Sequence, residues 1–461
     1  MTDLTLNTRP AQPLWLNEAK ALLKLAGPLA LAQLAQMAIL TTDVLLLGRF
    51  SREALASATI GNAVYYFAWL IGNGPASAVS PMVAQILGAH PNDRAHVRAA
   101  VRMSLWVAVL ISLPMMGILL NAGWILRHLG QDPALAKGAG VFVSMLCIGL
   151  PFTMGFQVLR NFTAALGKPG AALWVMVGSI FFNALVGWTL IFGHFGVARL
   201  GIVGSGLATA GSAVFAFVAM LAVIWLTPSV RKYRIFRRFL HPVRAKAVEV
   251  VRLGLPMGLA MIFEAMLFNT MTLVMGSFGI TSVAAHQITL NVASITFMIP
   301  LGIGMASTVR VGLAAGRNDL KAARLAGFTA AVMAAGFAAL CGLGMALYGQ
   351  QLATLYVPDQ TVAANREIAA LAGLLLIVAA AFQIFDSLQV VGVLSLRGLK
   401  DARASMILAG VSYWLAGAPV SIGLGVLLGW HGLGVWIGLA FGLAVAAAAM
   451  GARFVWLTKT P

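Results

Sequence analysis

The sequence predicts an all-α membrane protein with twelve transmembrane helices, arranged as two six-helix, pseudo-symmetric lobes around a central cavity. The composition carries the first part of this prediction: of 461 residues, 60% are hydrophobic and only 10% are charged, whereas charged residues make up about 25% of soluble globular domains. Long apolar runs carry the second part, because about 20 apolar residues cross the hydrocarbon layer as a helix. An internal repeat, described below, carries the third.

Twelve apolar stretches are each long enough to cross a bilayer. The glycine-flanked Trp430 and His431 indicate a tight turn between the last two. The predicted spans are 22–47, 57–82, 99–120, 139–158, 171–194, 202–226, 250–276, 281–306, 325–347, 367–393, 404–428 and 432–456.

The basic residues follow a topology pattern. An even number of spans places both termini on one side, and that side receives 25 of the 31 Lys and Arg residues. The other side receives six, which are Arg49, Arg52, Arg127, Lys137, Arg199 and Arg366. Cytoplasmic loops carry this excess of positive charge, so we expect both termini in the cytoplasm and a multi-pass protein of the plasma (bacterial inner) membrane. The net charge of +18 then requires no nucleic acid partner.

The N-terminal segment 1–13 is polar and lacks the apolar core of a removable signal peptide. The densest basic stretch, 231–252, lies between the sixth and seventh spans. We interpret this stretch as a solvated linker that follows the positive-inside bias, and a lipid-headgroup contact is the alternative.

An internal repeat divides the chain into two halves. Matching residues recur at an offset of 228 that later drifts to 232 and 230. We therefore predict an N-lobe over 1–226, a basic cytoplasmic linker over 227–249 and a C-lobe over 250–461. Six spans in each half give both halves the same orientation, related by an axis along the membrane normal. The pairs are Pro28 and Pro256, Gly48 and Gly276, Phe50 and Phe278, Gly88 and Gly316, Gln157 and Gln389, Lys168 and Lys400, and Gly204 and Gly434.

Three of the 13 acidic residues fall inside apolar spans: Asp43, Glu264 and Asp386. A charge at this depth costs at least about 2.5 kcal/mol, and such residues mark ion, proton or substrate paths. The alternative is a structural carboxyl that is neutral or hydrogen-bonded across helices. The apolar neighbours of Glu264 on its helix disfavour its charged form.

Helical spacing places glutamines beside two of these acids. Gln33 and Gln36 share a stripe with Asp43, and Gln383 and Gln389 flank Asp386 at intervals of three. Other intramembrane amides could bind an ion or substrate, or could hydrogen-bond neighbouring helices; these are Asn183, Asn269, Gln287 and Asn291. We expect His286 to lie at the membrane interface.

Enzymatic function has little support in the sequence. No P-loop, GxSxG, HExxH or CxxC motif is present, and Cys147 and Cys341 both lie in apolar runs. We expect no cofactor and no catalytic residues. An intramembrane aspartyl hydrolase built on Asp43 and Asp386 is a remote alternative, although the Gly-x-Gly-Asp context is missing at Asp386.

Several motifs together resemble the multidrug and toxic compound extrusion (MATE) family, specifically its NorM-like branch, over nearly the whole chain. They are Pro28 with Asp43, Ala285-His286-Gln287-Ile288 through Asn291, Ile299-Pro300-Leu301-Gly302, Gln383-x-x-Asp386-x-x-Gln389, Leu396-Arg397-Gly398-x-Lys400-Asp401, and Phe195-Gly196 followed by Gly204-Ser205-Gly206-Leu207-Ala208-Thr209.

The resemblance implies two lobes around a V-shaped cavity, and export of mostly cationic, amphipathic compounds driven by inward H+ or Na+. It implies that Glu264 and Asp386 are the coupling carboxylates of the C-lobe, and that they are the Na+ ligands where Na+ is the coupling ion. It also implies that Asp43 is the acid of the N-lobe, assisted by Asn183 and Thr209. Further candidates for ion or substrate contacts are Gln36, Phe268, Gln287, Asn291, Phe382, Gln383 and Gln389.

Two departures from the family pattern leave the coupling ion open. Many relatives carry a tyrosine where this chain has Phe382, and an Asn or Asp where it has Gly187. Both changes remove an oxygen ligand that a hard cation prefers. We therefore expect a monomeric antiporter for organic cations, coupled to H+ or Na+. A lipid-linked precursor flippase of the same superfamily is the alternative, and it would need several cationic residues facing the cavity, whereas the Lys and Arg residues here cluster in loops.

Overall fold

The computed structural model describes residues 14–459, and all its regular elements within that range are helical. The predicted absence of a signal peptide concerns residues outside this range. Twelve helices or helix pairs are long and apolar enough to cross a membrane. They are α1 Leu14–Phe50, α2 Arg52–Ala89, α3 Arg94–Leu120, α5 Pro133–Leu146 with α6 Leu150–Ala165, α7 Gly170–Phe192, α8 Ile202–Leu226, α10 Arg244–Ser277, α11 Ile280–Gly316, α12 Leu320–Tyr356, α13 Ala363–Gly398, α14 Ala402–Val411 with α15 Ala418–Ile422, and α16 His431–Leu457. Two short helices, α4 Ala122–His128 and α9 Pro228–Arg231, lie in connections.

The twelve predicted spans are confirmed, but most of the helices are longer than the predicted ranges. Helix α1 begins at Leu14 rather than at 22, and its early turns carry Lys20 and Lys24. Hydropathy detects only the part of a helix that lies in hydrocarbon, so it does not include the polar turns that continue the helix. The predicted turn before α16 is also found, with positive φ angles at Gly429 and His431.

Two of the twelve spans are irregular. A 3₁₀ turn at Cys147–Gly149 joins α5 to α6, and π-helical segments at Ser412–Gly417 and Gly423–Leu427 flank α15. Short π-helical segments occur frequently at functional sites. The first of these contains Tyr413, whose side chain reaches the cavity described below.

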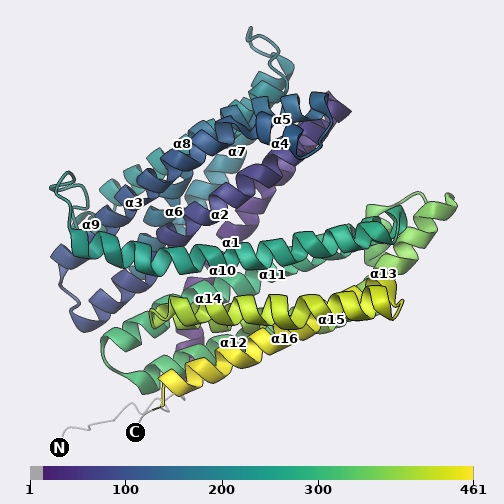
Figure 1. Cartoon of the computed structure of the whole chain (residues 1–461). Coiled ribbons are helices and arrows are strands. Elements are labelled where there is room, and N and C mark those ends of the chain that lie inside the picture. Colours follow the sequence, from purple (N-terminus) through teal and green to yellow (C-terminus); the bar gives the residue numbers. More distant parts are fainter. Residues whose placement is uncertain (1–13, 460–461) are drawn as a thin grey trace, which may run out of the picture.

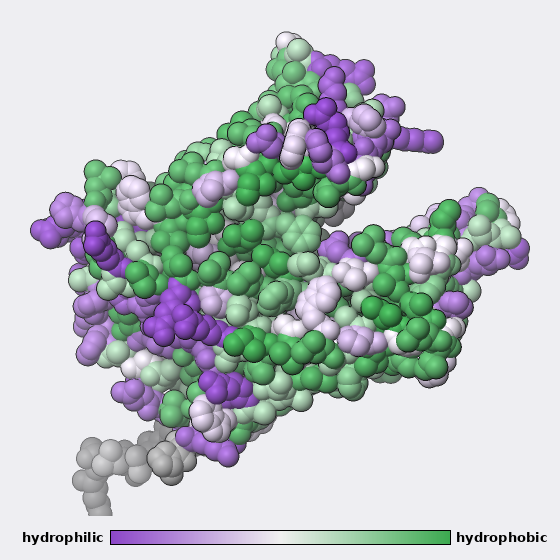
Figure 2. Space-filling model, in the orientation of Figure 1, coloured by the Kyte–Doolittle hydropathy of each residue, from purple (hydrophilic) through white to green (hydrophobic). Residues whose placement is uncertain are grey.

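The helices form two lobes that diverge from one end of the molecule (Figure 1). Helices α1 to α8 form the N-lobe, and α10 to α16 form the C-lobe. On the face that Figure 2 shows, most of the surface of both lobes is apolar, and most polar residues gather toward the two ends. This belt is the surface expected of a protein whose sides face lipid.

Contacts between the lobes repeat about a two-fold axis. A Cβ atom on Gly74 of α2 would lie 2.8 Å from the Cα atom of Gly258 in α10, and one on Gly302 of α11 would lie 2.8 Å from the Cα atom of Ala30 in α1. The two contacts are related by the offset of 228, since 74 corresponds to 302 and 30 to 258. The lobes are therefore pseudo-symmetric in packing.

The axis itself passes between α2 and α11. Ala84 and Gly312 are repeat equivalents, and a Cβ atom on Gly312 would lie 2.8 Å from that of Ala84. Gly88 and Gly316 are also equivalents, and a Cβ atom on Gly88 would lie 3.0 Å from the Cα atom of Gly316. Only glycine allows backbones to approach this closely. The domain boundaries at 226 and 250 stay predictions; α10 begins inside the predicted linker.

The lobes are joined at the end where α1 begins and α2, α11 and α16 finish. Arg310 of α11 binds both carboxylate oxygens of Glu18 in α1, with 2.7 Å between Nε and Oε1. The Nε2 atom of Gln85 donates to the carbonyl oxygen of Gly398 at 2.8 Å. Buried aliphatic side chains from α1, α11, α12 and α13 complete this junction. The space between the lobes is therefore closed at this end and opens toward the opposite one, where the space-filling view shows a hollow between the lobes (Figure 2).

Candidate functional site

A cavity of ≈ 570 Å³ lies between the lobes. Its walls come from α1, α2 and α6 of the N-lobe and from α10, α11, α13, α14 and the π-helical segment of the C-lobe. Figure 2 shows the opening between the lobes that leads toward it. Seven predicted site residues line this cavity, which are Gln36, Glu264, Phe268, Asn269, Phe382, Asp386 and Gln389.

Glu264 and Asp386 approach the cavity from α10 and α13. Asp386 is 6% exposed, its Oδ1 atom has no hydrogen-bond partner, and the charge of Glu264 acts on it. Within the part of the chain that the structure describes, neither acid forms an ion pair with Lys, Arg or His. Two acids that share a cavity and lack a bonded counter-ion are chemically able to accept a cation or a proton.

Two residues of this site were missed in the sequence. The fully buried Tyr413 hydroxyl has no hydrogen-bond partner and lies within the electrostatic influence of both acids. Arg397 also interacts electrostatically with Glu264, and its Nη2 atom is 3.4 Å from the carbonyl oxygen of Met257. The sequence did contain a signal for Arg397. Gln389, Val393 and Arg397 are spaced by four residues, so they lie on one face of the helix.

The expectation that Lys and Arg stay away from the cavity was wrong for Arg160 and Arg397. Both are almost fully buried and line the cavity. The two lie just beyond the predicted spans 139–158 and 367–393, whereas the observed helices α6 and α13 continue past them. A long side chain on the last turns of a helix can reach inward as well as outward.

Aromatic residues support the wall around Asp386. Phe382 packs edge-on against Phe268 and against Trp436, with ring centroids 6.1 and 5.2 Å apart. The Nε1 atom of Trp436 donates to Nδ1 of His286 at 3.1 Å, so the His286 proton lies on Nε2, which faces Thr272 Oγ1 at 3.1 Å. The expected interfacial position of His286 was wrong, because α16 covers this residue completely.

Three predicted candidates of the C-lobe lie outside the cavity lining. The Gln383 amide donates to the carbonyl oxygen of Ala293 at 3.1 Å and to the Thr296 hydroxyl, and so joins α13 to α11. Gln287 and Asn291 are exposed, and Asn291 Oδ1 accepts a 2.8 Å bond from the Tyr356 hydroxyl. Helix-to-helix hydrogen bonding therefore accounts for Gln383 and Asn291 in this conformation.

Asp43 occupies a separate place inside the N-lobe. It is 4% exposed, and its Oδ2 atom accepts a 2.8 Å hydrogen bond from the Thr209 hydroxyl. The fully buried Asn183 lies close enough to Asp43 to influence its carboxyl group. The amide nitrogen and oxygen atoms of Asn183 make no hydrogen bond of ordinary geometry. None of the three lines the central cavity. A side chain at Gly187 would meet Leu46 at 3.0 Å, so an apolar group fills the space there.

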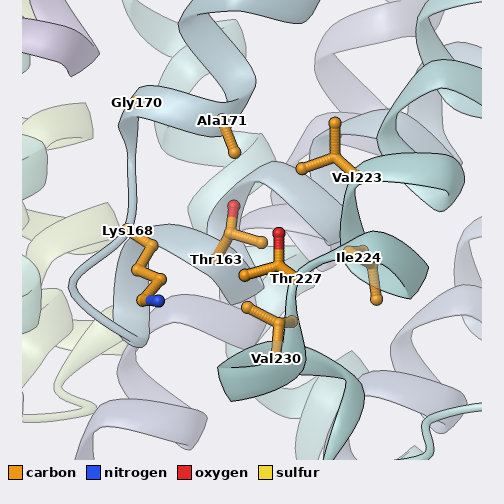
Figure 3. Close-up of a pocket in the computed structure, with 8 residues that line it drawn as sticks. All are labelled: Thr163, Lys168, Gly170, Ala171, Val223, Ile224, Thr227 and Val230. Carbon is orange, nitrogen blue, oxygen red and sulfur yellow. The ribbon is translucent and has the colours of Figure 1, made fainter.

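A smaller cavity of ≈ 260 Å³ lies at the junction of α6, α7, α8 and α9 (Figure 3). Lys168 reaches its edge and donates to the Ser229 hydroxyl. The other lining residues are Thr163, Gly170, Ala171, Val223, Ile224, Thr227 and Val230. It contains no acid and none of the predicted site residues, so it is distinct from the cavity that Glu264 and Asp386 line.

Comparison with known proteins agrees with this architecture. The family model MatE matches residues 28–189 and 256–422, one segment in each lobe. The chain belongs to the MATE family. A MATE relative from Mesorhizobium japonicum, called a probable multidrug resistance protein NorM, is 41% identical over 460 residues, which cover 100% of this chain and 98% of that protein. A relative of the same name from Brucella suis is 39% identical and covers 95% and 93%.

Solved structures show the same fold. The eukaryotic MATE transporter AtDTX14 superposes with a TM-score of 0.83 at 22% identity, over 96% of each chain. MATE proteins are transporters rather than enzymes, so the hydrolase alternative is set aside. The protein is a multi-pass membrane transporter of the multidrug efflux type.

Proposed function

We propose that this transporter exports amphipathic organic cations in exchange for H+ or Na+ that enters through the same cavity. The observation that carries the proposal is the position of Glu264 and Asp386 on the wall of one cavity, next to Phe268 and Phe382. Acids attract the charge of a cationic amphiphile, and the aromatic rings contact its apolar part.

Exchange follows from the electrostatics of this site. A buried carboxylate without a bonded counter-ion is costly, so a proton, a metal cation or a cationic substrate must compensate it. These ligands compete for the same two acids. Arrival of H+ or Na+ from one side therefore favours release of the substrate to that side, and substrate binding from the other side favours release of the ion.

Oxygen atoms near the acids support either coupling ion. Gln389 Oε1 has no hydrogen-bond partner, and the Tyr413 hydroxyl is likewise unpaired. A hard cation such as Na+ takes several oxygen ligands, and Tyr413 supplies a phenolic oxygen in place of the one that Phe382 lacks. A proton requires only the carboxylates. Both ions therefore remain candidates within the proposal.

The sidedness of transport follows from the positive-inside bias. That bias assigns both termini to the cytoplasm, and the lobes are joined at the end where α1 begins and α16 finishes. We propose that this conformation faces outward and that rocking of the lobes opens the opposite end. One chain supplies both lobes and every wall of the cavity, which supports a monomeric transporter.

Asp43 has a separate proposed role. Its position beside Thr209, away from the cavity lining, supports a second, substrate- or proton-responsive site in the N-lobe. Protonation or substrate contact there would change the packing of α1 against α8.

Efflux of a fluorescent organic cation from proteoliposomes tests the proposal, with H+ and Na+ gradients imposed separately. We expect one or both gradients to drive efflux by the natural protein, and Glu264→Gln and Asp386→Asn each to abolish that dependence. Glu367→Gln is a matched control, because Glu367 is an exposed acid on the same helix as Asp386. Gradient-driven efflux that persists in both cavity variants would overturn the proposal.

A further inference from the structure

The segment 232–243, which connects α9 to α10 and so joins the two lobes, is folded against α3 (Figure 1). Three side chains of α3 donate hydrogen bonds to backbone carbonyl oxygens of this connecting segment. The bonds run from Arg98 Nε to Tyr233 at 3.0 Å, from Arg102 Nη1 to Arg238, and from Trp106 Nε1 to Phe239 at 3.0 Å. The connecting segment therefore has a defined conformation, which a solvated linker does not require.

The side chains of the connecting segment divide between two directions. Tyr233 and Ile235 are buried in the core of the N-lobe, and the Tyr233 ring packs edge-on against Phe162 with ring centroids 5.8 Å apart. Phe239 stacks on Trp106 at 5.6 Å. The exposed side chains are Arg234, Phe236, Arg237, Arg238 and Leu240. One face of the segment is thus fixed to the lobe, and the other presents basic and apolar groups together.

The arginines of this region form a cluster without a bonded counter-ion. Arg98 lies within the electrostatic influence of Arg102, Arg234, Arg237 and Arg238. No ion pair includes any of these five within residues 14–459. The backbone is left-handed at Arg234 and Arg238, with φ angles of 48° and 57°, and this conformation costs free energy for a residue with a Cβ atom. A negatively charged ligand would relieve the repulsion that the fold maintains here.

The corresponding face of the C-lobe lacks such a cluster. Helices α3 and α12 both begin after an aspartate whose side chain caps the helix. Aligning the two caps places Arg98 opposite Arg324 and Trp106 opposite Val332. Arg324 and Val332 are both exposed, so no segment covers this face of α12. The packing symmetry of the lobes therefore does not require the basic segment, and a function specific to the N-lobe is the better explanation.

The cluster lies at the level where α3 enters hydrocarbon. Arg102 is the last charged residue of α3, and residues 103–120 contain none. The exposed Leu110 begins the lipid-facing surface of α3 two turns further along. Phe236 and Leu240 are 48% and 77% exposed beside the arginines, and Figure 2 shows hydrophilic and hydrophobic residues together at this end of the N-lobe. Phospholipid headgroups occupy this boundary between water and hydrocarbon.

We infer that the connecting segment and the start of α3 form a binding site for an anionic phospholipid. Its phosphate would accept hydrogen bonds from Arg234 and Arg237, and its acyl chains would lie beside Phe236, Leu240 and the apolar surface of α3. Clusters of basic residues directly beside a transmembrane helix recognise anionic headgroups. This inference goes beyond the proposed export function and does not depend on it.

A soluble phosphate is the other source of the same headgroup chemistry. Arginines alone would bind either ligand, because both offer phosphate oxygens. Phe236 and Leu240 favour the lipid, since a soluble anion gains nothing from exposed apolar side chains, whereas a lipid buries them. We therefore assign the site to a phospholipid and use glycerol 3-phosphate as the contrasting ligand.

Quenching of a fluorophore at the site tests the inference in the full-length protein. A bimane is attached at Leu240→Cys in a background with Cys147→Ser and Cys341→Ser, and the protein is placed in phosphatidylcholine nanodiscs. A small fraction of phosphatidylglycerol or of phosphatidylcholine then carries a nitroxide on its acyl chain, near the glycerol. We expect the parent to prefer labelled phosphatidylglycerol at least about tenfold, and Arg234→Gln with Arg237→Gln to lower this preference at least about fivefold.

Two controls separate a folded site from general attraction between charges. Arg317→Gln with Arg324→Gln removes two exposed positive charges from the same end of the C-lobe, and should leave the preference within about twofold of the parent because salt screens distant charges. Trp106→Leu keeps every charge but removes the hydrogen bond to Phe239. This variant should lower the preference about threefold, since it releases one anchor of the connecting segment.

Each contrary outcome overturns the inference. Equal quenching by the two labelled lipids in the parent would show that no anionic lipid is selected at this place. Equal losses in the two double variants, or an unchanged preference in Trp106→Leu, would reduce the effect to net charge. Loss of the preference on addition of glycerol 3-phosphate would assign the site to a soluble phosphate instead. Thermal unfolding of each variant in detergent confirms that the protein compared is folded.

Discussion

The two lobes are equivalent in their packing and unequal in their charge. Gln36 of the N-lobe and Glu264 of the C-lobe are repeat equivalents at the offset of 228, and both line the central cavity. Asp43 corresponds in the same way to Met271, which is completely buried. Helices α1 and α10 are repeat equivalents, yet Asp43 lies seven residues further along α1 than Glu264 lies along α10.

That shift of seven residues is two helical turns, or about 10 Å along the helix. It moves the acid from the cavity wall to an enclosed position where Thr209 donates to it. Symmetric packing holds the lobes together, whereas the asymmetric placement of charge gives each lobe a separate chemical role. The C-lobe provides the acids of the cavity, and the N-lobe provides Gln36 and Arg160.

The largest predicted effect tests this asymmetry directly. Glu264→Gln should lower gradient-driven efflux at least about 100-fold, because it removes one of the two intramembrane acids that we propose to couple export to the gradient. Adding Gln36→Glu restores the number of acids in the cavity but places the second one in the N-lobe, away from Tyr413. We expect no recovery in the double variant, measured as efflux under imposed H+ and Na+ gradients. Recovery would show that acid count, rather than the lobe that carries the acid, determines coupling.

The symmetry of packing predicts equal effects in the two lobes. Gly74→Ala and Gly302→Ala each introduce a Cβ atom less than 3 Å from the partner backbone. Overpacking of this kind costs about 1–3 kcal/mol, and the melting temperatures of the two variants in detergent should fall by similar amounts.

Glycines with open space provide the controls for that pair. Gly117 of α3 and Gly344 of α12 have no neighbouring atoms within 4 Å of the point that an added Cβ atom would occupy, and alanine there improves helix propensity by up to about 1 kcal/mol. These variants should melt at the same temperature as the natural protein or higher. A loss at Gly74 without a matching loss at Gly302 would contradict the two-fold equivalence of the contacts.

The third prediction concerns the enclosed acid. Asp43→Asn retains an oxygen that can accept from Thr209, whereas Thr209→Val removes the donor and leaves a buried carboxylate oxygen unpaired. If Asp43 acts through its charge, Asp43→Asn should slow efflux about tenfold, which corresponds to about 1.4 kcal/mol. Thr209→Val should lower stability by about 1–3 kcal/mol. Efflux assays and thermal unfolding separate the two effects, and normal efflux by Asp43→Asn would remove the N-lobe site from the mechanism.

The sequence was sufficient to predict the fold and to identify the intramembrane acids, because both features can be recognised from the order of residues alone. Apolar length predicted the spans, and the charge cost of Asp43, Glu264 and Asp386 in hydrocarbon identified them without any contact information. The repeat offset predicted the symmetric lobes, which the Gly74 and Gly302 contacts confirm.

The other residues near the cavity were harder to predict, because whether each one reaches it depends on the direction in which its side chain points. Arg160 and Arg397 lie beyond the apolar runs, so hydropathy assigned them to loops, although their helices continue and turn them toward the cavity. His286 lies near the start of α11, and only the position of Trp436, 150 residues later, shows that it is buried. Gln383 and Gln389 share one stripe, yet only Gln389 lines the cavity.

The smallest predicted effect concerns an interaction that breaks the symmetry of the closed end. Glu18 and Arg310 join α1 to α11 across the lobes, but their repeat equivalents are Lys246 and Met82, and Lys246 pairs with Glu249 instead. Only one side of the axis therefore has this ion pair. Partly exposed pairs contribute up to about 1 kcal/mol, so Glu18→Gln or Arg310→Gln should favour opening of this end by no more than about fivefold.

Alkylation of a cysteine at Gln33, in a background with Cys147→Ser and Cys341→Ser, measures that opening when the reagent is added only on the side where α1 begins. Either single variant should react faster than the parent, and the exchanged pair Glu18→Arg with Arg310→Glu should return the rate toward the parental value. Since exchange restores the attraction while reversing both charges, rescue distinguishes an ion pair between the lobes from two independent surface charges. Equal rates in all four proteins would mean that glycine packing alone keeps this end closed.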